Sequence, residues 1–476
     1  LLNPGKVVDA PAMEENWRIP PGKVPTDPPT VLDFSKQGGI FRSTEACNGS
    51  AVCRKTQGGA MCPSYRATKD ERDSTRGRAN ALRIAIDCDS RMGNETQRPT
   101  RNVQHTPLDH RWLYEVMDLC LSCKACKSEC PANVDLAKLK AEFLQAFYAK
   151  RPRPIGHLLV KNIHRLSPLG APLAGLNNWL LRRPWVRRVL ESMAGIDRRR
   201  SLPELHGEHL RKWFEKRKKQ RTSRGPLSVV LLDDCFTTFQ EPQIGRAAIN
   251  LLESAGYSVE LAGVCCGRAM ISKGFLTDAR RLAQEGVAKL DHFASAGVPI
   301  LGLEPSCILT LADEWPELVP GSAAKRVAAA AEMADGWFAR HVSDNGVPPE
   351  LSSSRGRAEG ESPLKPGKVL FHAHCHQKAL VGSKGSVDAL KLIPTLDVTV
   401  LDAGCCGMAG AFGYEKEHYD LSVQIANLAL IPAITSEPDA LVVATGTSCR
   451  HQIRDLTGRR AMHPLEVLAE ELKIES

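Results

Sequence analysis

The chain has 476 residues, of which 42% are hydrophobic and 25% are charged. It is long enough for several domains with their own cores, and this composition excludes a disordered or fibrous protein. No run of about 18 apolar residues occurs, so the sequence predicts no membrane-spanning helix. The net charge is +9, and it is concentrated between Arg151 and Pro226, where 19 Lys/Arg face 5 Asp/Glu.

Sixteen cysteines, bunched into short motifs with two adjacent Cys-Cys pairs, dominate the sequence. Adjacent cysteines rarely bridge each other, because a disulfide needs Cα atoms about 5.5 Å apart in a specific orientation. The first residues lack the basic and apolar regions of a signal peptide. We therefore expect thiolates that hold metal in a reducing compartment, the cytoplasm.

Residues 1–35 are proline-rich and without periodicity, which predicts a domain tail followed by a linker. Residues 36–150 form a cysteine-rich segment, in which residues 120–131 follow the pattern C-x2-C-x2-C-x3-C-P. This pattern is typical of a four-iron cubane whose fourth cysteine serves a second cluster, whereas zinc sites use separated C-x2-C pairs. The sequence thus predicts a helical, ferredoxin-type domain with two 4Fe-4S clusters. The four cysteines are Cys120, Cys123, Cys126 and Cys130.

The partner motif of such a domain is present at residues 47–63 in altered form. Cys47 and Cys53 stand six apart, but Ser50 occupies the place of the second ligand, and Cys62 precedes a proline after an insertion. By the crossover of ligands, one cluster takes Cys62, Cys120, Cys123 and Cys126, and the other takes Cys47, Cys53 and Cys130. Three thiolates predict a 3Fe-4S cluster or a four-iron cluster with an unusual fourth ligand. Cys88 is a candidate for that ligand, but a buried structural thiol is the favoured interpretation of Cys88.

Residues 151–226 are interpreted as a basic helical connector. Pro184 can begin a helix that runs to Ala194. Its apolar side would carry Trp185, Val186, Val189, Leu190 and Met193, and its other side Arg187, Arg188 and Glu191. The favoured interpretation is a packed bridge with a solvated basic face. The alternative is peripheral association with an anionic membrane at its inner face. No nucleic-acid partner is expected, because no fold that reads nucleic acid accompanies the charge.

From Leu227 onward, strand and helix patterns alternate, which predicts a parallel α/β layer. Strands are expected at 228–234 and 257–263, with a helix at 241–256 between them. Four cysteines recur at nearly constant spacing in 227–349 and in 367–476, so we predict two duplicated α/β cysteine-rich domains joined by a linker at 350–366. The repeated positions are Cys235, Cys265, Cys266 and Cys307 in the first repeat, and Cys375, Cys405, Cys406 and Cys449 in the second.

Each repeat contains a Cys-Cys-Gly turn, which sets two thiolates at the carboxyl ends of the strands. The repeats hold either a further cluster or metal, or thiols that are redox-active or merely structural. Three histidines surround Cys375, and alternation on a strand would place them on one face. There His374 and His376 are accessory candidates for metal binding or proton transfer, as is His372, unless they only cap the strand end.

Several segments resemble a known family. The stretch CRKTQGGAMCPSYRATKDERDSTRGR resembles the iron–sulfur region of FAD-linked glycolate, D-lactate and D-2-hydroxyglutarate dehydrogenases, and the opening LLNPGK resembles the end of their flavin domain. HCHQKAL, CCGMAGAFG and SCRHQI are similar to the C-terminal half of the fused members. The repeats also resemble domains of heterodisulfide reductases and of the anaerobic glycerol-3-phosphate dehydrogenase iron–sulfur subunit, although Thr310 and Gln452 replace the last cysteine.

The resemblance implies an oxidoreductase that acts on CH–OH donors, in which this chain relays electrons from FAD to a quinone or another carrier. It implies an FAD-binding domain upstream, fused or as a separate subunit, and it assigns no catalytic residue within this chain. The alternatives are a separate electron-transfer subunit and thiol–disulfide reduction at the repeats. The GMAGAFG stretch lacks the spacing of a dinucleotide fingerprint.

Overall fold

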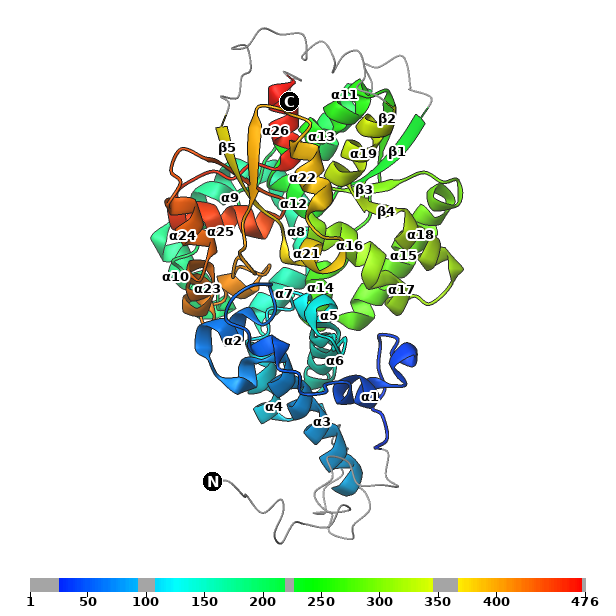
Figure 1. Ribbon diagram of the computed structural model, residues 1–476, viewed down its shortest axis with the longest axis vertical. Coiled ribbons are helices and arrows are strands. Elements are labelled where there is room, and N and C mark those ends of the chain that lie inside the picture. Colours follow the sequence, from blue (N-terminus) through cyan, green and yellow to red (C-terminus); the bar gives the residue numbers. More distant parts are fainter. Residues whose placement is uncertain (1–24, 93–107, 219–226, 346–366, 473–476) are drawn as a thin grey trace.

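The computed structural model describes residues 25–92, 108–218, 227–345 and 367–472. The protein combines helices and sheets: a helical part lies at one end of the molecule, and two parallel sheets lie at the other (Figure 1). The LLNPGK opening and the linker expected at 350–366 lie outside the described residues.

The first part, up to residue 150, contains only helices among its described residues. Its core is formed by buried apolar side chains such as Leu82, Leu113 and Phe143. The Asp135 carboxylate accepts a hydrogen bond from the Lys138 backbone N–H at 3.1 Å and so begins the last helix. The elements are η1 (Ser35–Gln37), α1 (Ile40–Glu45), η2 (Val52–Arg54), α2 (Pro63–Thr68), η3 (Glu71–Asp73), α3 (Thr75–Met92), α4 (Arg111–Asp118), α5 (Ala125–Glu129) and α6 (Leu136–Phe147).

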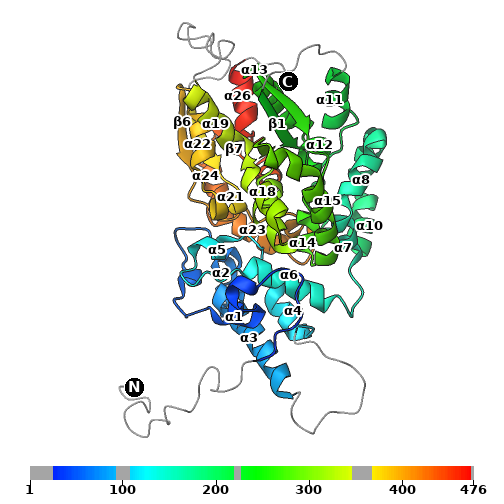
Figure 2. The same ribbon diagram turned by 90° about the vertical axis from the view of Figure 1, so that its right-hand side faces the viewer.

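The connector is helical as well, and it runs along one side of the molecule (Figure 2). Pro184 begins α10, and Gly195, with φ of 68°, ends it in a left-handed conformation. None of the helices in the described ranges is long and apolar enough to cross a membrane. The elements are α7 (Ile155–Lys161), α8 (Ile163–Gly170), η4 (Ala171–Leu173), α9 (Ala174–Leu181), α10 (Pro184–Ala194) and α11 (Leu210–Lys218).

The packed-bridge interpretation of α10 is wrong for its apolar side. Trp185 and Met193 are 60% and 63% exposed, and Val189 is 45% exposed. Val186 and Leu190, on the same side, are partly buried, so the interpretation is wrong for three of the five apolar side chains.

The first repeat contains a four-stranded parallel sheet in the order β2-β1-β3-β4. Alternate side chains of β1 face two different cores: Val230 and Leu232 pack on the side of α15, whereas Val229 and Leu231 pack on the side of α13. The strands are β1 (Leu227–Leu232), β2 (Tyr257–Leu261), β3 (Ile300–Gly302) and β4 (Ala331–Met333). The helices are α12 (Cys235–Phe239), α13 (Pro242–Ser254), α14 (Arg268–Ser272), α15 (Leu276–Ser295), α16 (Pro305–Asp313), α17 (Trp315–Leu318), α18 (Ser322–Ala330) and α19 (Ala334–Asn345).

The second repeat contains a three-stranded parallel sheet in the order β6-β5-β7, with β5 central as β1 is in the first. The two repeats share one core, because Val369 and Phe371 of β5 pack in the same cluster as Val229 and Leu231 of β1. The strands are β5 (Gly367–His372), β6 (Leu396–Val400) and β7 (Leu441–Ala444). The helices are α21 (Cys375–Leu380), α22 (Lys384–Leu390), η5 (Phe412–Tyr414), α23 (Tyr419–Asn427), α24 (Leu430–Thr435), α25 (Thr447–Thr457) and α26 (Pro464–Glu471).

Candidate iron–sulfur site

The loop that carries the ferredoxin-type motif is bent by two left-handed residues. Ser122 and Lys124, with φ of 50° and 62°, flank Cys123, and such conformations cost about 1–3 kcal/mol unless the surroundings hold them. Cys123 and Cys126 are buried, and Cys120 is partly buried. The backbone N–H of Leu136 donates to the Cys126 sulfur at 3.4 Å, a contact of the kind that tunes a cluster's potential.

The altered motif, residues 47–63, lies next to the motif at residues 120–131. Cys62 precedes α2 with a left-handed φ of 51°, and its sulfur lies 3.1 Å from the backbone nitrogen of Thr75 and 2.9 Å from the Thr75 hydroxyl. The Glu129 carboxylate accepts hydrogen bonds from the backbone N–H groups of Ala60 at 2.7 Å and Met61 at 3.1 Å. Glu129 belongs to α5, so these bonds fasten the two cysteine motifs together.

Cys62 lies between the two predicted ligand sets. A hydrogen bond from Cys62 lowers the pKa of Cys53 to about 6, and the same bond, with burial, raises the pKa of Cys62. The charge of Cys126 also raises the pKa of Cys62. Because Cys62 interacts with a cysteine of each predicted ligand set, the crossover assignment stays a prediction. Cys47 and Cys130 are both buried at 8% exposure, and the side chain of Cys88 lies outside the described residues.

The donor set fits iron–sulfur clusters. Burial raises the pKa of both Cys123 and Cys126, so their thiolates need a nearby positive charge, which iron supplies. No three His, Cys, Asp or Glu side chains in the described ranges are arranged to hold one metal ion. A cubane binds its thiolates at separate iron atoms and therefore does not need such a tight group.

Two lysines within the motif tie the loop to the first repeat. The Lys124 side chain is 2% exposed, and its Nζ lies 2.7 Å from the Asp313 carboxylate and 2.5 Å from that of Glu314. Lys127 also pairs with Asp313. Burial opposes the ionisation of Asp313, but the charges of Lys124 and Lys127 hold its pKa at about 2. No local pattern in the sequence points to these lysines, because the carboxylate that Lys124 meets lies 189 residues away.

The loop also contacts the second repeat. The His376 Nε2 donates to the carbonyl of Ser122 at 3.0 Å, and α5 lies beside α21 (Figures 1 and 2). After burial, the charge of Cys375 is the next cause that raises the pKa of Cys123. The ferredoxin-type cysteines and the second repeat are therefore direct neighbours.

The four cysteines of the first repeat come together at the carboxyl ends of the strands. Cys235 begins α12, Cys265 and Cys266 follow β2, and Cys307 lies in the first turn of α16, where the helix dipole favours a thiolate. Hydrogen bonds from Cys235 and Cys266 lower the pKa of Cys265. Cys266 is in turn hydrogen-bonded to Cys307, so the four thiols form a continuous chain.

The second repeat reproduces this chain of thiols. Cys405 is hydrogen-bonded to Cys375 and Cys406, and Cys406 is hydrogen-bonded to Cys449. These bonds lower the pKa of Cys375 and Cys406. Gly407 has φ of 86°, and a Cβ at this position would lie 2.2 Å from the Ser422 carbonyl oxygen, so the turn requires glycine.

The histidines around Cys375 do not share a strand face, which corrects the sequence analysis. β5 ends at His372; His374 caps α21 by accepting from the His376 backbone N–H at 3.2 Å, and His376 lies within that helix. The alternating pattern ends because Cys375 begins a helix. Burial opposes charging of His374, but the Cys375 thiolate raises its pKa to about 9.

His372 is the unusual member of this group. Its ring is fully buried, and within the described residues neither ring nitrogen has a hydrogen-bond partner. Burial lowers its pKa to about 3, so the ring is neutral, and it lies near Cys406. Orphaned buried nitrogens are rare, and these fit a bound group beside the thiols of the second repeat.

The positions of the missing last cysteines have structural roles. The Thr310 hydroxyl donates to the Ser306 carbonyl at 2.7 Å. The Gln452 amide oxygen accepts from the buried Arg200 guanidinium at 2.6 Å. Both side chains are thus bound within the protein.

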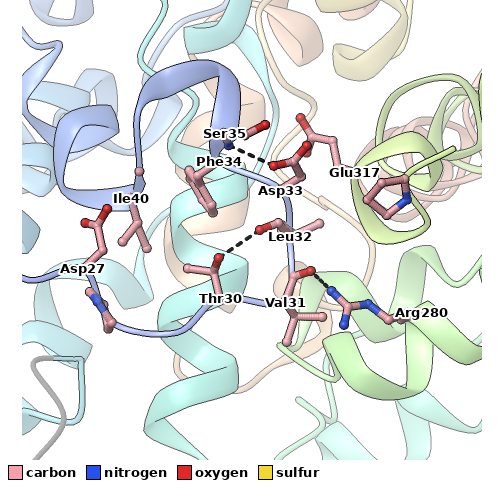
Figure 3. Close-up of a pocket in the computed structure, with 13 residues that line it drawn as sticks. Asp27, Thr30, Val31, Leu32, Asp33, Phe34, Ser35, Ile40, Arg280 and Glu317 are labelled. Atoms are coloured by element: carbon pink, nitrogen blue, oxygen red, sulfur yellow. Dashed lines mark hydrogen bonds between the residues drawn. The ribbon is translucent and has the colours of Figure 1, made fainter.

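A cavity of about 550 Å³ lies away from all of these cysteines, between residues 27–40 and the helix that carries Arg280, α15 (Figure 3). Its polar groups bond one another: the Thr30 hydroxyl donates to the Leu32 carbonyl at 3.0 Å, and the Arg280 guanidinium donates to the Val31 carbonyl. None of the predicted ligands lines it, so it carries no assignment.

Comparisons with known proteins agree with this arrangement. Residues 43–134 match the model of a 4Fe-4S dicluster domain, and residues 229–312 and 369–454 each match that of a cysteine-rich domain. The chain therefore contains a ferredoxin-type domain that binds iron–sulfur clusters, followed by two cysteine-rich domains.

Its relatives are oxidoreductases. The chain is 26% identical to a D-2-hydroxyglutarate dehydrogenase of Pantoea ananatis, over 96% of this chain and 48% of the relative. It is 28% identical to one subunit of the anaerobic glycerol-3-phosphate dehydrogenase of Escherichia coli, over 72% of this chain and 83% of the relative. It is 25% identical to the glycolate oxidase iron-sulfur subunit of E. coli, over 87% of this chain and 92% of the relative. The chain spans about half the length of the D-2-hydroxyglutarate dehydrogenases it matches.

Proposed function

We propose that this chain is the iron–sulfur electron-transfer part of a flavin-dependent 2-hydroxy-acid dehydrogenase of the D-lactate or D-2-hydroxyglutarate type. The support is the dicluster domain, the paired cysteine-rich domains, and relatives whose names denote D-2-hydroxyglutarate dehydrogenases and a glycolate oxidase subunit. When bound, iron–sulfur clusters accept and release single electrons, which suits them to follow a two-electron flavin.

The observation that carries this proposal is the contact between the ferredoxin-type loop and the second repeat. The charge of Cys375 raises the pKa of Cys123, and the bond from His376 to Ser122 holds the two segments together. Both thiols are buried. Such adjacency is what a relay of single electrons requires.

The partners follow from the same proposal. An FAD-binding domain supplies electrons, either fused upstream or as a separate subunit. A quinone or another electron carrier, in the cytoplasm or at the inner face of the membrane, accepts them. The separate-subunit form is the second candidate, because the chain covers 83% and 92% of two relatives that are subunits. The coding sequence upstream of Leu1 separates the two forms.

The test uses the full chain, reconstituted without oxygen with iron and sulfide. We expect it to accept electrons from a chemical reductant and from a reduced flavoprotein, seen as bleaching of the cluster absorbance. We expect no turnover of D-lactate or D-2-hydroxyglutarate with a dye acceptor, because abstraction of a hydride equivalent needs a flavin or nicotinamide. Turnover without added flavoprotein would refute the relay and move catalysis to the repeats.

A further inference from the structure

The connector helices α7 to α10 carry their large apolar side chains on the outside. Eleven of the sixteen exposed large hydrophobic residues among the described residues lie between Ile155 and Met193. They follow helical spacing, so each helix contributes one outward stripe. The most exposed are Leu169 at 75%, Met193 at 63%, Leu173 and Trp185 at 60%, Leu176 at 53% and Trp179 at 50%. We call this surface the outer face of α7–α10.

The buried residues of the same helices are small apart from His157, and some larger apolar residues, such as Leu180 and Leu190, are partly buried. Ser167, Ala171, Ala174 and Ala194 are buried, and a Cβ on Gly156 would lie 2.3 Å from the Ala194 carbonyl oxygen. A surface helix normally buries its large apolar residues and exposes its polar ones. The inversion here means that the outer face of α7–α10 is built to meet something apolar.

The charges on these helices are mostly positive: α10 contains one acidic residue, Glu191, and two of the basic residues are paired with carboxylates, Lys161 with Asp278 at 2.7 Å and Arg182 with Glu204 at 2.5 Å. Residues 151–190 contain eight Lys/Arg and no Asp/Glu. Arg165, Arg183 and Arg188 are exposed, and the Arg183 guanidinium stacks over the Trp179 ring at 4.1 Å from its centroid. Indole rings beside arginines are typical of the boundary between acyl chains and headgroups, and cations there attract anionic lipids.

We propose that the outer face of α7–α10 binds the surface of an anionic phospholipid bilayer. The leucines, tryptophans and Met193 enter the headgroup boundary, and the arginines contact lipid phosphates. α8 packs on α12, which Cys235 begins, and α7 packs on α14, which follows Cys266. Docking in this way holds the thiols of the first repeat beside the lipid. The inference is independent of which substrate the enzyme uses.

The test is flotation of the full chain with vesicles. We expect binding to vesicles that contain phosphatidylglycerol, little binding to pure phosphatidylcholine, and loss of binding at high salt, because the cationic attraction is screened. The fluorescence of Trp179 and Trp185 should shift to the blue and be quenched by brominated acyl chains. Absence of binding to anionic vesicles by the cluster-loaded chain would overturn the proposal.

Two variants locate the surface. Leu169→Ser combined with Trp185→Ser and Met193→Ser should weaken vesicle binding at least tenfold, and so should Arg165→Glu with Arg188→Glu. The matched control, Val381→Ser with Leu428→Ser, removes exposed apolar side chains elsewhere and should bind normally. An unchanged iron content confirms that each variant folds. If the variants instead abolish a dimer, or binding of a purified flavoprotein, while vesicle binding persists, the face has a protein partner and the proposal is wrong.

Discussion

The His376 ring donates a hydrogen bond at 3.0 Å to the carbonyl of Ser122, a residue 254 positions earlier in the chain. Ser122 is one of the two left-handed residues that shape the ferredoxin-type loop. A residue of the second repeat thus helps to fix the conformation of the loop that carries Cys120 and Cys123.

Replacement of His376 should affect both the second repeat and the ferredoxin-type loop. His376→Phe leaves the Ser122 carbonyl without its donor, which costs about 1–3 kcal/mol for a buried group. We expect a lower unfolding midpoint in urea and a changed paramagnetic resonance spectrum of the reduced cluster at residues 120–126. His292→Phe, on the exposed surface of α15, is the control. A variant identical to the parent in both measurements would show that the contact has no such role.

The cluster of Cys47, Cys53 and Cys130 should be of the three-iron type. With only three thiolate ligands, the oxidised protein should give the paramagnetic resonance signal of a 3Fe-4S cluster, whereas an oxidised four-iron cubane with a 2+ core is diamagnetic. Ser50→Cys restores the missing thiol and should remove the signal. A diamagnetic oxidised parent with a full iron content would point to a hidden fourth ligand.

Cys62→Ser tests the crossover of ligands. We expect damage to the cluster at Cys120, Cys123 and Cys126, about 60 residues downstream, with iron per chain falling by roughly one cluster. Cys62 is hydrogen-bonded to Cys53, and the charge of Cys126 raises its pKa, so the result tells the two ligand sets apart. Survival of the 120–126 signal with loss of only the Cys47 site would reverse the assignment.

Gly407→Ala should lower the free energy of unfolding by more than the cost of a left-handed backbone conformation alone. At Gly407 a methyl group would lie 2.2 Å from the Ser422 carbonyl oxygen, whereas at Gly410, with φ of 63°, nothing lies within 4 Å. We expect Gly410→Ala to cost about 1–2 kcal/mol and Gly407→Ala at least about 1 kcal/mol more. Equal shifts in thermal unfolding would contradict the close approach.

Stability should depend on pH through His418. Its ring pairs with Asp118 at 2.8 Å and Glu415 at 2.9 Å, while Lys273 and His157 also face Glu415. Burial disfavours charging of His418, but the hydrogen bonds and charges of Asp118 and Glu415 raise its pKa. The stabilisation is therefore complete below the unfolded pKa of about 6.5 and is lost as pH rises through the higher folded pKa.

The His418→Gln variant measures this contribution directly. The difference in thermal midpoint between parent and variant should be largest near pH of about 6 and shrink towards pH of about 9. A difference that stays constant or grows over this range would mean that His418 is neutral in the folded protein.

Local patterns in the sequence predicted much of the fold. The strands expected at 228–234 and 257–263 correspond to β1 and β2, and the helix expected at 241–256 corresponds to α13. Apolar runs and terminal glycines, which lie within each short segment, determine these elements. The ferredoxin-type and cysteine-rich domains were predicted correctly, whereas the domain boundaries and the ligand sets stay predictions.

Contacts between distant segments could not be predicted in this way. Nothing local links Lys124 to Asp313 or His418 to Asp118, because the pairing depends on how finished elements dock. The periodicity of α10 identified its apolar side but not the direction in which that side faces. The alternation around Cys375 suggested a strand, because a helix that begins at the cysteine breaks the pattern only after the first two histidines.

The chain of thiols occurs twice, but its two copies have different neighbours. The copy at Cys375 adjoins Cys123, whereas the copy at Cys265 lies near His164 of the connector. The residue that caps the first helix of each copy has diverged accordingly: Asp234 in one and His374 in the other. After a gene duplication of this kind, selection acts on each copy through its own surroundings, so one copy can change its chemistry while the other keeps its ancestral role.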